Sequence, residues 1–256
     1  MRRLFLPALF ALIVPLSPPA ARGQSKPDLP TAEMVLNQYI EATGGKDAYK
    51  KITSRVLTGT VELTGANIMG PIKLTQAAPN KLLLVMTLGP IGETKQGTDG
   101  KDAWEVSAVT GERDMSGEEK EAFIREASFY KELDWKELYA KVECVGTEDV
   151  EGKPAYKVVL SPKSGKPTTQ YYDKTNHLVV KQTSTTNSPM GEISVDVYPS
   201  DYKSVDGILI PFTVTQKVLT QQIVMKMKEI KQNVEVPADL GRRPAPADAP
   251  VKKKAD

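Results

Sequence analysis

Few residues in this chain could carry out catalysis or bind a metal. It has one histidine and one cysteine, which leaves little material for an imidazole-based site and excludes a cysteine-rich zinc site or an internal disulfide. His177 ends the polar stretch 173–177 between two strand patterns, which predicts a solvated turn. Cys144 lies in a predicted strand with no histidine near it in the sequence, so no activated thiol is expected.

Three carboxylates, Glu118, Glu119 and Glu121, could be interpreted as a paired acid and base. They directly follow Ser116-Gly117, however, and a helix start favours acidic residues through its dipole. The sequence has no Gly-x-Ser-x-Gly elbow and no phosphate-binding loop. We therefore predict no enzyme activity, no cofactor and no metal site.

The N-terminus has the features of an export signal. Arg2 and Arg3 precede an apolar stretch over 4–16, and Ala21 and Gly23 have the spacing that signal peptidase prefers. We predict a signal peptide over 1–23, cleaved after Gly23, and a periplasmic protein; an uncleaved membrane anchor is the alternative. The apolar stretch is shorter than the roughly 20 residues of a membrane-spanning helix, so no transmembrane segment is expected in the mature chain.

The net charge of +2 comes from the two ends of the chain. Residues 1–23 hold three arginines and no acid, and residues 241–256 hold five basic and two acidic residues, so residues 24–240 carry a net charge of −4. This mildly acidic region predicts no nucleic-acid partner. The Pro-, Ala- and Lys-rich stretch 241–256 has no apolar period and is predicted to be a disordered tail.

The remaining residues, 24–240, show alternating strand patterns interrupted by helical ones. Thr31 can cap a helix over 32–43, and Ser116 with Glu119 forms a capping-box pattern before a helix over 118–132. Shorter helices are expected over 47–52 and 135–139. Strands are predicted over 56–64, 72–77, 82–88, 93–98, 102–108, 141–150, 155–160, 168–173, 178–185, 192–202, 212–220 and 222–234.

These elements predict a single mainly β (α+β) domain over 24–240. Ten to twelve antiparallel strands joined by short turns are typical of a large curved sheet or half-open barrel. The concave face of such a sheet must be filled by side chains, a helix or a ligand, and the helices over 32–43 and 118–132 are suited to close it. A fully packed core and a hydrophobic ligand cavity beneath the helices are both compatible with this pattern.

Strand alternation also predicts which apolar residues would line such a cavity. Trp104 alternates with Glu105, and Phe212 with Thr213, so each of these strands buries one face. The predicted lining from the strands is Ile72, Leu74, Leu84, Met86, Trp104, Val106, Phe212, Val214, Met225 and Met227, and from the mid-chain helix Phe123 and Ala127.

Several turn and strand motifs resemble those of a known family. The stretch 72–81, with Pro79-Asn80 near its end, and the hairpin 99–104, with Asp99-Gly100-Lys101 and Trp104, resemble the bacterial outer-membrane lipoprotein carrier and sorting family (LolA-like). The segments 172–173, 201–203 and 205–212 are similar to its divergent sorting-protein branch. The resemblance covers roughly residues 31–236.

This resemblance implies a half-open barrel, closed by helices, whose cavity takes up lipoprotein acyl chains in the periplasm. The arginine that precedes Pro-Asn in the carriers, and helps to hold their helical lid shut, is replaced by Ala78. Arg55 and Arg125 are candidates to take its place. Two hypotheses follow: a periplasmic binding protein for a lipid or lipoprotein acyl chain, or a non-catalytic module with a filled core that docks an envelope protein.

Overall fold

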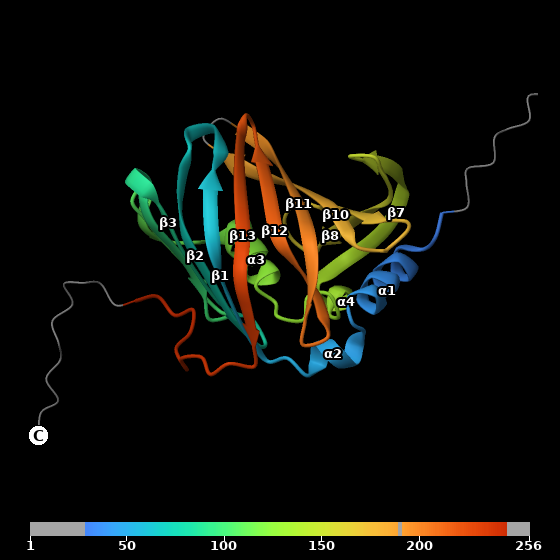
Figure 1. Cartoon of the computed structure of the whole chain (residues 1–256), viewed down its shortest axis with the longest axis horizontal. Coiled ribbons are helices and arrows are strands. Elements are labelled where there is room, and N and C mark those ends of the chain that lie inside the picture. The colour runs from blue at the N-terminus through green and yellow to red at the C-terminus, as the bar shows by residue number, and fades with distance from the viewer. Residues whose placement is uncertain (1–28, 189–190, 245–256) are drawn as a thin grey trace, which may run out of the picture.

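Thirteen antiparallel strands form one open sheet in the computed structural model of the chain (Figure 1). The structure describes residues 29–188 and 191–244. The predicted signal peptide over 1–23, and residues 245–256 of the predicted tail, lie outside the described residues. The predicted fold class, a mainly β protein with a large open antiparallel sheet and a few helices, is confirmed.

The first and last strands of the chain pair at the centre of the sheet. The strand order is β6-β5-β4-β3-β2-β1-β13-β12-β11-β10-β9-β8-β7, so every neighbouring pair except β1 and β13 is consecutive in the sequence. The N-terminal half consists of β1 (Ser54–Leu63), β2 (Ile68–Ala77), β3 (Lys81–Leu88), β4 (Gly92–Thr98), β5 (Ala103–Ser107) and β6 (Gly111–Asp114). The C-terminal half consists of β7 (Tyr139–Val150), β8 (Lys153–Pro162), β9 (Thr168–Asp173), β10 (Val179–Ser188), β11 (Gly191–Val205), β12 (Ile208–Val218) and β13 (Gln221–Gln232).

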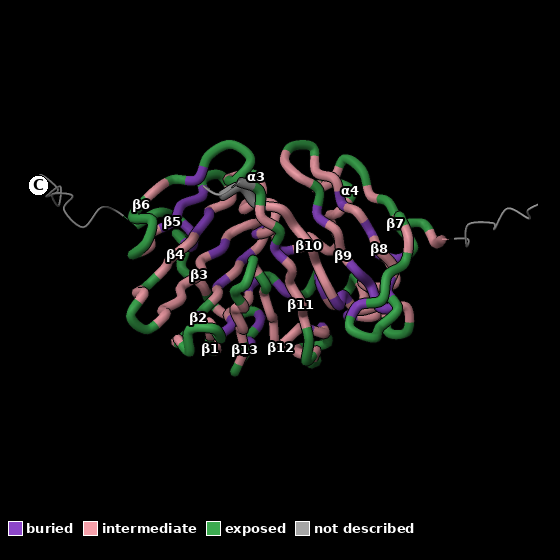
Figure 2. Tube along the Cα trace, turned by 90° about the horizontal axis from the view of Figure 1, so that it is seen from above, coloured by how far each residue is buried: buried purple, intermediate pink, exposed green. Residues whose placement is uncertain are grey.

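This topology places the mid-chain helices on the concave side of the sheet. Strands β6 and β7 are its two edges, yet they follow one another in the sequence, so the segment between them must pass from one edge to the other. That segment contains α3 (Gly117–Glu126) and α4 (Trp135–Leu138). Figure 2 shows the strands following a curve, with α3 between the N-terminal and C-terminal halves of the sheet. We call these two halves the arms of the sheet.

The N-terminal helices form as the local sequence predicts. The Thr31 hydroxyl accepts a hydrogen bond from the Met34 N–H at 3.2 Å and so caps α1 (Ala32–Ala42). The short helix α2 (Lys46–Lys50) follows Gly44-Gly45. Helix α1 packs its apolar face on β8, β9 and β10, where Val35 and Leu36 contact Leu160 and Val179 in one buried cluster.

Helix α3 differs from its prediction at both ends. It ends at Glu126, not at residue 132, because the next residues leave the helical path to dock on the sheet. The Phe129 N–H donates to the Pro79 carbonyl at 2.8 Å, and the Tyr130 hydroxyl donates to the Ile52 carbonyl at 2.9 Å. The predicted capping box is wrong, since the Ser116 side chain makes no cap hydrogen bond and the Glu119 carboxylate binds Arg113.

Two further differences concern the sheet and the tail. Strand β6 (Gly111–Asp114) was not predicted, because its four residues, Gly-Glu-Arg-Asp, show no apolar alternation. The predicted tail begins at Gly241, but residues 241–244 still lie against β5 and β6. The Arg243 guanidinium forms ion pairs with Glu112 at 3.1 Å and with Asp114 at 2.7 Å. Within residues 29–188 and 191–244, none of the helices is both long and apolar enough to span a membrane.

Candidate ligand-binding cavity

The pairing register shows which side chains share the concave face. Leu57 lies opposite Leu74, which lies opposite Leu84. The same row continues through Gln96 to Glu105 on β5. Directly opposite residues of antiparallel strands point to one face, and Leu57 and Leu74 pack with residues of α2 and the segment after α3. This row therefore marks the face that the helices cover.

A cavity of about 230 Å³, here called the inner cavity, lies between the C-terminal half of the sheet and helices α1 and α4. Apolar side chains from both sides form much of its wall, together with aromatic rings and with the polar side chains of Glu126, Lys131, Glu132, Gln170 and Gln182. The apolar part consists of Leu36, Leu160, Val179, Val197, Pro199, Pro211 and Val214, and the aromatic part of Tyr39, Trp135, Tyr139, Tyr172 and Tyr202.

The tyrosines of the inner cavity are neutral, and two of them form hydrogen bonds within the protein. Burial raises the pKa of Tyr39 and of Tyr172 well above the usual value of 10. The Tyr202 hydroxyl donates to the Val179 carbonyl at 2.9 Å, and the Tyr172 hydroxyl donates to the Gln170 side chain. Because these two hydroxyls are already paired, the wall can offer their rings to an apolar ligand without leaving a buried polar group unsatisfied.

A larger cavity of about 680 Å³, here called the outer cavity, lies between α3 and the two arms of the sheet. Its wall is mixed, with charged and amide groups beside a few apolar ones. From the helical segment it takes Met115, Glu118, Glu119, Ala122, Phe123, Arg125 and Glu126, and from the sheet Gln96, Arg113, Gly165, Lys166, Pro167, Thr168, Gln182, Ser184 and Thr185.

An ion pair marks the boundary between the two cavities. Glu126 and Gln182 line both of them, and the Glu126 carboxylate lies 2.8 Å from the Lys131 ammonium group. The charge of Lys131 lowers the pKa of Glu126, and the carboxylate raises the pKa of Lys131. Both groups are therefore charged at neutral pH, so an apolar chain that occupied both cavities would pass beside a fixed charge pair.

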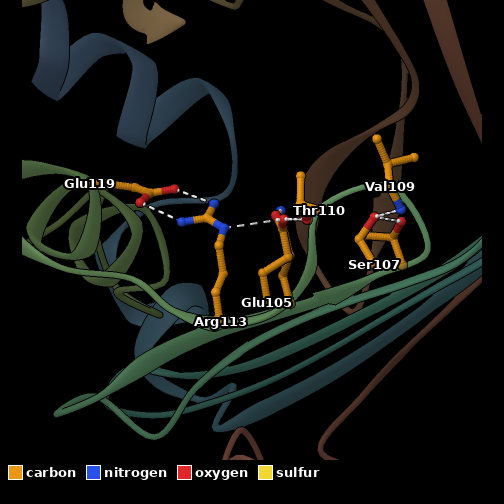
Figure 3. A network of polar contacts seen from close by, with 8 residues as sticks. Glu105, Ser107, Val109, Thr110, Arg113 and Glu119 are labelled. Carbon is orange, nitrogen blue, oxygen red and sulfur yellow. Dashed lines mark hydrogen bonds and ion pairs between the residues drawn. The ribbon is translucent and has the colours of Figure 1, made fainter. Parts of the chain in front are cut away.

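Polar contacts attach α3 to the N-terminal arm (Figure 3). The Arg113 guanidinium on β6 forms two hydrogen bonds with Glu119 of α3, at 2.6 and 2.8 Å, and lies 3.5 Å from the Glu105 carboxylate. Burial opposes the charge of Glu105, but hydrogen bonds from Thr110 and Gln96, with the charge of Arg113, lower its pKa overall. Lys120 of α3 also pairs with Asp102 at 3.0 Å.

Helix α3 contributes no buried residue to the core within its ten residues. Its C-terminal end is fixed by the segment that follows, where Phe129 packs against the sheet and the Arg55 guanidinium lies 5.5 Å from the centre of the Phe129 ring. Arg125, the other candidate to replace the missing family arginine, lies 6.0 Å from the ring centre of Tyr139. Both arginines thus contact the helical side of the fold.

The structure brings only some of the predicted lining residues to a cavity. Val214 lines the inner cavity and Phe123 the outer one, whereas Ala127 is fully buried just after α3. Leu74, Phe212 and Met227 pack in the apolar cluster beneath α2 and Phe129. By register, four more point to the concave face without lining either cavity, namely Ile72, Leu84, Met86 and Met225.

The remaining two predicted residues, Trp104 and Val106, lie on the opposite face of the sheet. Glu105 points to the helices, so its neighbours in β5 point away from them. Trp104 is nevertheless buried, because the C-terminal segment covers it and the Gly241 carbonyl accepts a hydrogen bond from its indole N–H at 2.7 Å. The amphipathic pattern was correct, but it did not show which face the helices cover.

The tyrosines and glutamines of the inner cavity were missed by sequence reasoning. Gln170 and Tyr172 both face the cavity from β9, and their alternation could have placed them on one face. Tyr171 is buried on the other face in a cluster with Val150 and Val180. Since both faces of β9 carry a buried tyrosine, the sequence pattern did not show which of the two faces the cavity.

His177 and Cys144, the two residues with catalytic potential, line neither the inner nor the outer cavity. His177 has a left-handed backbone with φ 62°, and its N–H donates to the Asp173 carbonyl at 2.9 Å, which confirms the predicted turn. Burial raises the pKa of the Cys144 thiol, which opposes formation of a thiolate. Across the residues that the structure describes, no group of His, Cys, Asp and Glu side chains is arranged to hold a metal ion.

No family model and no curated protein matches this chain. Among solved structures, a LolA superfamily protein from Nitrosomonas europaea is similar over 84% of this chain and 99% of its own, with 11% identity and a TM-score of 0.56. The chain therefore shares its fold with this LolA superfamily protein. The resemblance inferred from the turn motifs is thereby confirmed at the level of the fold.

Two further solved structures share this fold with the chain. A DUF1329 family protein from Desulfovibrio piger covers 81% of this chain and 95% of its own, with 15% identity and a TM-score of 0.53. A domain named for outer-membrane lipoprotein sorting, from Vibrio parahaemolyticus, covers 81% and 96%, with 12% identity and a TM-score of 0.51.

Proposed function

We propose that this chain is an exported periplasmic carrier that holds a lipid or lipoprotein acyl chain between the sheet and its helices. The observation that supports this best is the pair of adjoining cavities beneath the helices, the larger of which is covered by α3, a helix that buries no side chain in the core. A helix attached in this way can move at small cost, since the apolar core stays intact without it.

The chemistry of the inner cavity suits an apolar chain. Each methylene transferred from water contributes about 0.8 kcal/mol, so retention of an acyl chain needs apolar walls and no catalytic group. Leu36, Val197 and Val214 supply such walls, and the tyrosine rings add surface that tolerates many chain positions. The sorting function in the name of the Vibrio parahaemolyticus domain supports the same class of ligand.

The size of the inner cavity requires the ligand to extend beyond it. Its volume of about 230 Å³ is below the roughly 300–1,000 Å³ of common ligand pockets. A long chain would therefore also occupy the outer cavity, with its polar end among the charged and amide groups there. The same small volume favours the second candidate, an envelope interaction module that carries no ligand.

The test is a lipid analysis together with a pair of matched variants. Protein exported and purified from a bacterial host should contain lipid that mass spectrometry detects, and that lipid should displace a fluorescent hydrophobic probe. Val214→Gln, which places an amide in the inner cavity, should weaken probe binding about tenfold, from the cost of burying an unpaired polar group. Val106→Gln makes the same change on the opposite face and should leave binding unaltered.

Each outcome bears on one of the two candidates. Lipid-free protein that binds no probe, together with one stoichiometric envelope protein in the same preparation, would establish the interaction module. Equal effects of the two substitutions would place the ligand outside the inner cavity.

A further inference from the structure

The hairpin turns at one end of the sheet expose large apolar side chains. Met69 after the β1–β2 turn, Val109 in the β5–β6 turn and Leu219 in the β12–β13 turn are 61%, 74% and 64% exposed. The β3–β4 turn, Gly89–Ile91, lies between the first two in strand order. In Figure 1 the β1–β2 and β12–β13 tips project at the top of the molecule. We call these four turns the apolar rim.

The apolar rim carries no charge. Residues 63–69, 88–92, 107–111 and 218–221 include no Asp, Glu, Lys or Arg, in a chain where 26% of residues are charged. Turns at the other end of the sheet are charged, as Asp99 to Asp102 and Asp173-Lys174 show. The β8–β9 connection at the same end carries Lys163 and Lys166, so the lack of charge is a property of the four rim turns and not of the whole end of the sheet.

Leu219 occupies a backbone conformation that disfavours leucine. Its φ of 53° is left-handed, a region in which Asn, Asp and Gly are preferred. Most other non-glycine residues with positive φ in the described chain are Asn, Asp or His, and none of them is apolar. A leucine at this exposed turn adds no core packing and strains the backbone, so its side chain points to a role in contact with another surface.

The backbone of the rim can leave bulk water at limited cost. The Val109 N–H donates to the Ser107 hydroxyl at 3.1 Å (Figure 3), and the Asn67 N–H donates to the Thr64 carbonyl at 3.3 Å. Polar groups that are bonded within the turn avoid most of the penalty for entering an apolar medium.

These features fit a lipid surface better than a protein partner. Met69, Val109 and Leu219 project from separate hairpins and line neither the inner nor the outer cavity, so the rim presents these side chains on separate tips. Side chains on separate tips can each be surrounded by lipid at the boundary between headgroups and acyl chains.

Charges behind the tips indicate which lipids are compatible. The pairs Glu93–Lys95 and Glu151–Lys217 lie just beyond the charge-free turns and are locally neutral. Such pairs provide no excess of positive charge for anionic headgroups. We propose that the apolar rim docks shallowly into a bilayer of zwitterionic phospholipid.

Docking through the rim would also orient the outer cavity. The β8–β9 connection, which supplies Gly165 to Thr168 of its wall, is at the same end of the sheet, as are Ser184 and Thr185 near the end of β10. If the chain carries a lipid as proposed above, this orientation brings the outer cavity to the membrane. The docking itself does not depend on that function.

The test measures binding of the full exported chain to vesicles of phosphatidylcholine and phosphatidylethanolamine by flotation. Met69→Asp, Val109→Asp and Leu219→Asp should each weaken vesicle binding about tenfold, because a charge replaces a side chain that enters the interface. Met34 and Val145, which are 51% and 50% exposed away from the rim, provide matched controls. Met34→Asp and Val145→Asp should bind vesicles as the unmodified chain does.

Leu219→Asn separates docking from folding. Asparagine accepts the left-handed backbone more readily, so this variant should unfold at a higher temperature while it binds vesicles more weakly. The proposal is overturned if the unmodified chain does not bind the vesicles, or if the control substitutions reduce binding as much as the rim substitutions do. Probe binding in the inner cavity, measured on the same variants, should be unchanged, so a failure of docking is distinguishable from a failure of the carrier function.

Discussion

The two longest helices cover the same face of the sheet but are held there by different forces. Helix α1 buries Ala32, Val35, Leu36 and Ile40 against the C-terminal half. Helix α3 buries none of its ten residues, and its attachment to the N-terminal arm consists of charged contacts through Arg113 and Lys120.

This difference implies that the two helices are held to the sheet with different strength. Burial of an apolar side chain contributes about 1.5–3 kcal/mol, whereas an exposed ion pair contributes about 0–1 kcal/mol. Helix α1 is therefore part of the core, and we expect α3 to separate from the sheet more readily than α1 does. The outer cavity lies where α3 meets the two arms of the sheet.

The largest expected effect compares one truncation in each helix. Ile40→Ala in α1, where the side chain is 1% exposed, should lower the free energy of unfolding by about 3 kcal/mol through loss of burial and the resulting cavity. Phe123→Ala in α3, at the outer cavity, should lower it by less than about 1 kcal/mol. Urea denaturation of both variants measures the two costs. Similar losses would show that α3 belongs to the core.

A smaller effect tests the anchor of α3 through its dependence on pH. The folded state lowers the pKa of Glu105, so the stabilisation is present at pH values above the ordinary glutamate pKa and is lost as the pH falls through the lowered one. Glu105→Gln should therefore cost about 1 kcal/mol at pH 7, and the cost should shrink in acid. Thermal unfolding between pH 3 and pH 7 measures this difference.

Glu93→Gln is the control for that measurement. Its carboxylate pairs with Lys95 at 2.6 Å on the exposed surface, so its substitution should change the unfolding temperature little at either pH. A cost of Glu105→Gln that is the same at pH 3 and pH 7 would contradict the assigned role of the Glu105 charge.

The smallest effect on stability should accompany a local change in motion. Arg113→Gln removes the ion pairs to Glu119 and Glu105 and should reduce global stability by less than about 1 kcal/mol. Hydrogen exchange of the amides over 117–126 should nevertheless become faster, because α3 loses its main contact with the arm. Lys136→Gln breaks the exposed pair with Glu33 of α1 and should leave exchange in α1 unchanged.

The sequence predicted correctly those elements that are determined by contacts between neighbouring residues. The cap at Thr31, the apolar stripe of α1 and most strands follow from neighbouring residues, and the structure contains them. The end of α3 was wrong because Phe129 and Tyr130 bond to Pro79 and Ile52, far away in the sequence. Helical periodicity carries no information about such partners.

The site was less predictable than the fold for the same reason. Three consecutive residues of β5, Ala103 to Glu105, are buried, so alternation alone could not show which face the helices cover. Residues near the C-terminus cover Trp104, and the tyrosines of the inner cavity come from α1, β7, β9 and β11. Their convergence depends on curvature of the whole sheet, which no single strand specifies.

The central pairing of β1 with β13 has a consequence for the order of folding. Arg55 lies opposite Gln232, so this seam joins residues from nearly opposite ends of the domain, whereas every other strand pair closes through a local hairpin. During synthesis, β1 has no partner on one side until the last strand emerges, and an unpaired edge strand is a template for aggregation. Pairings between residues that are distant in the sequence are slow to form. Pairing of β1 with β13 is therefore the step that joins the two halves into one sheet.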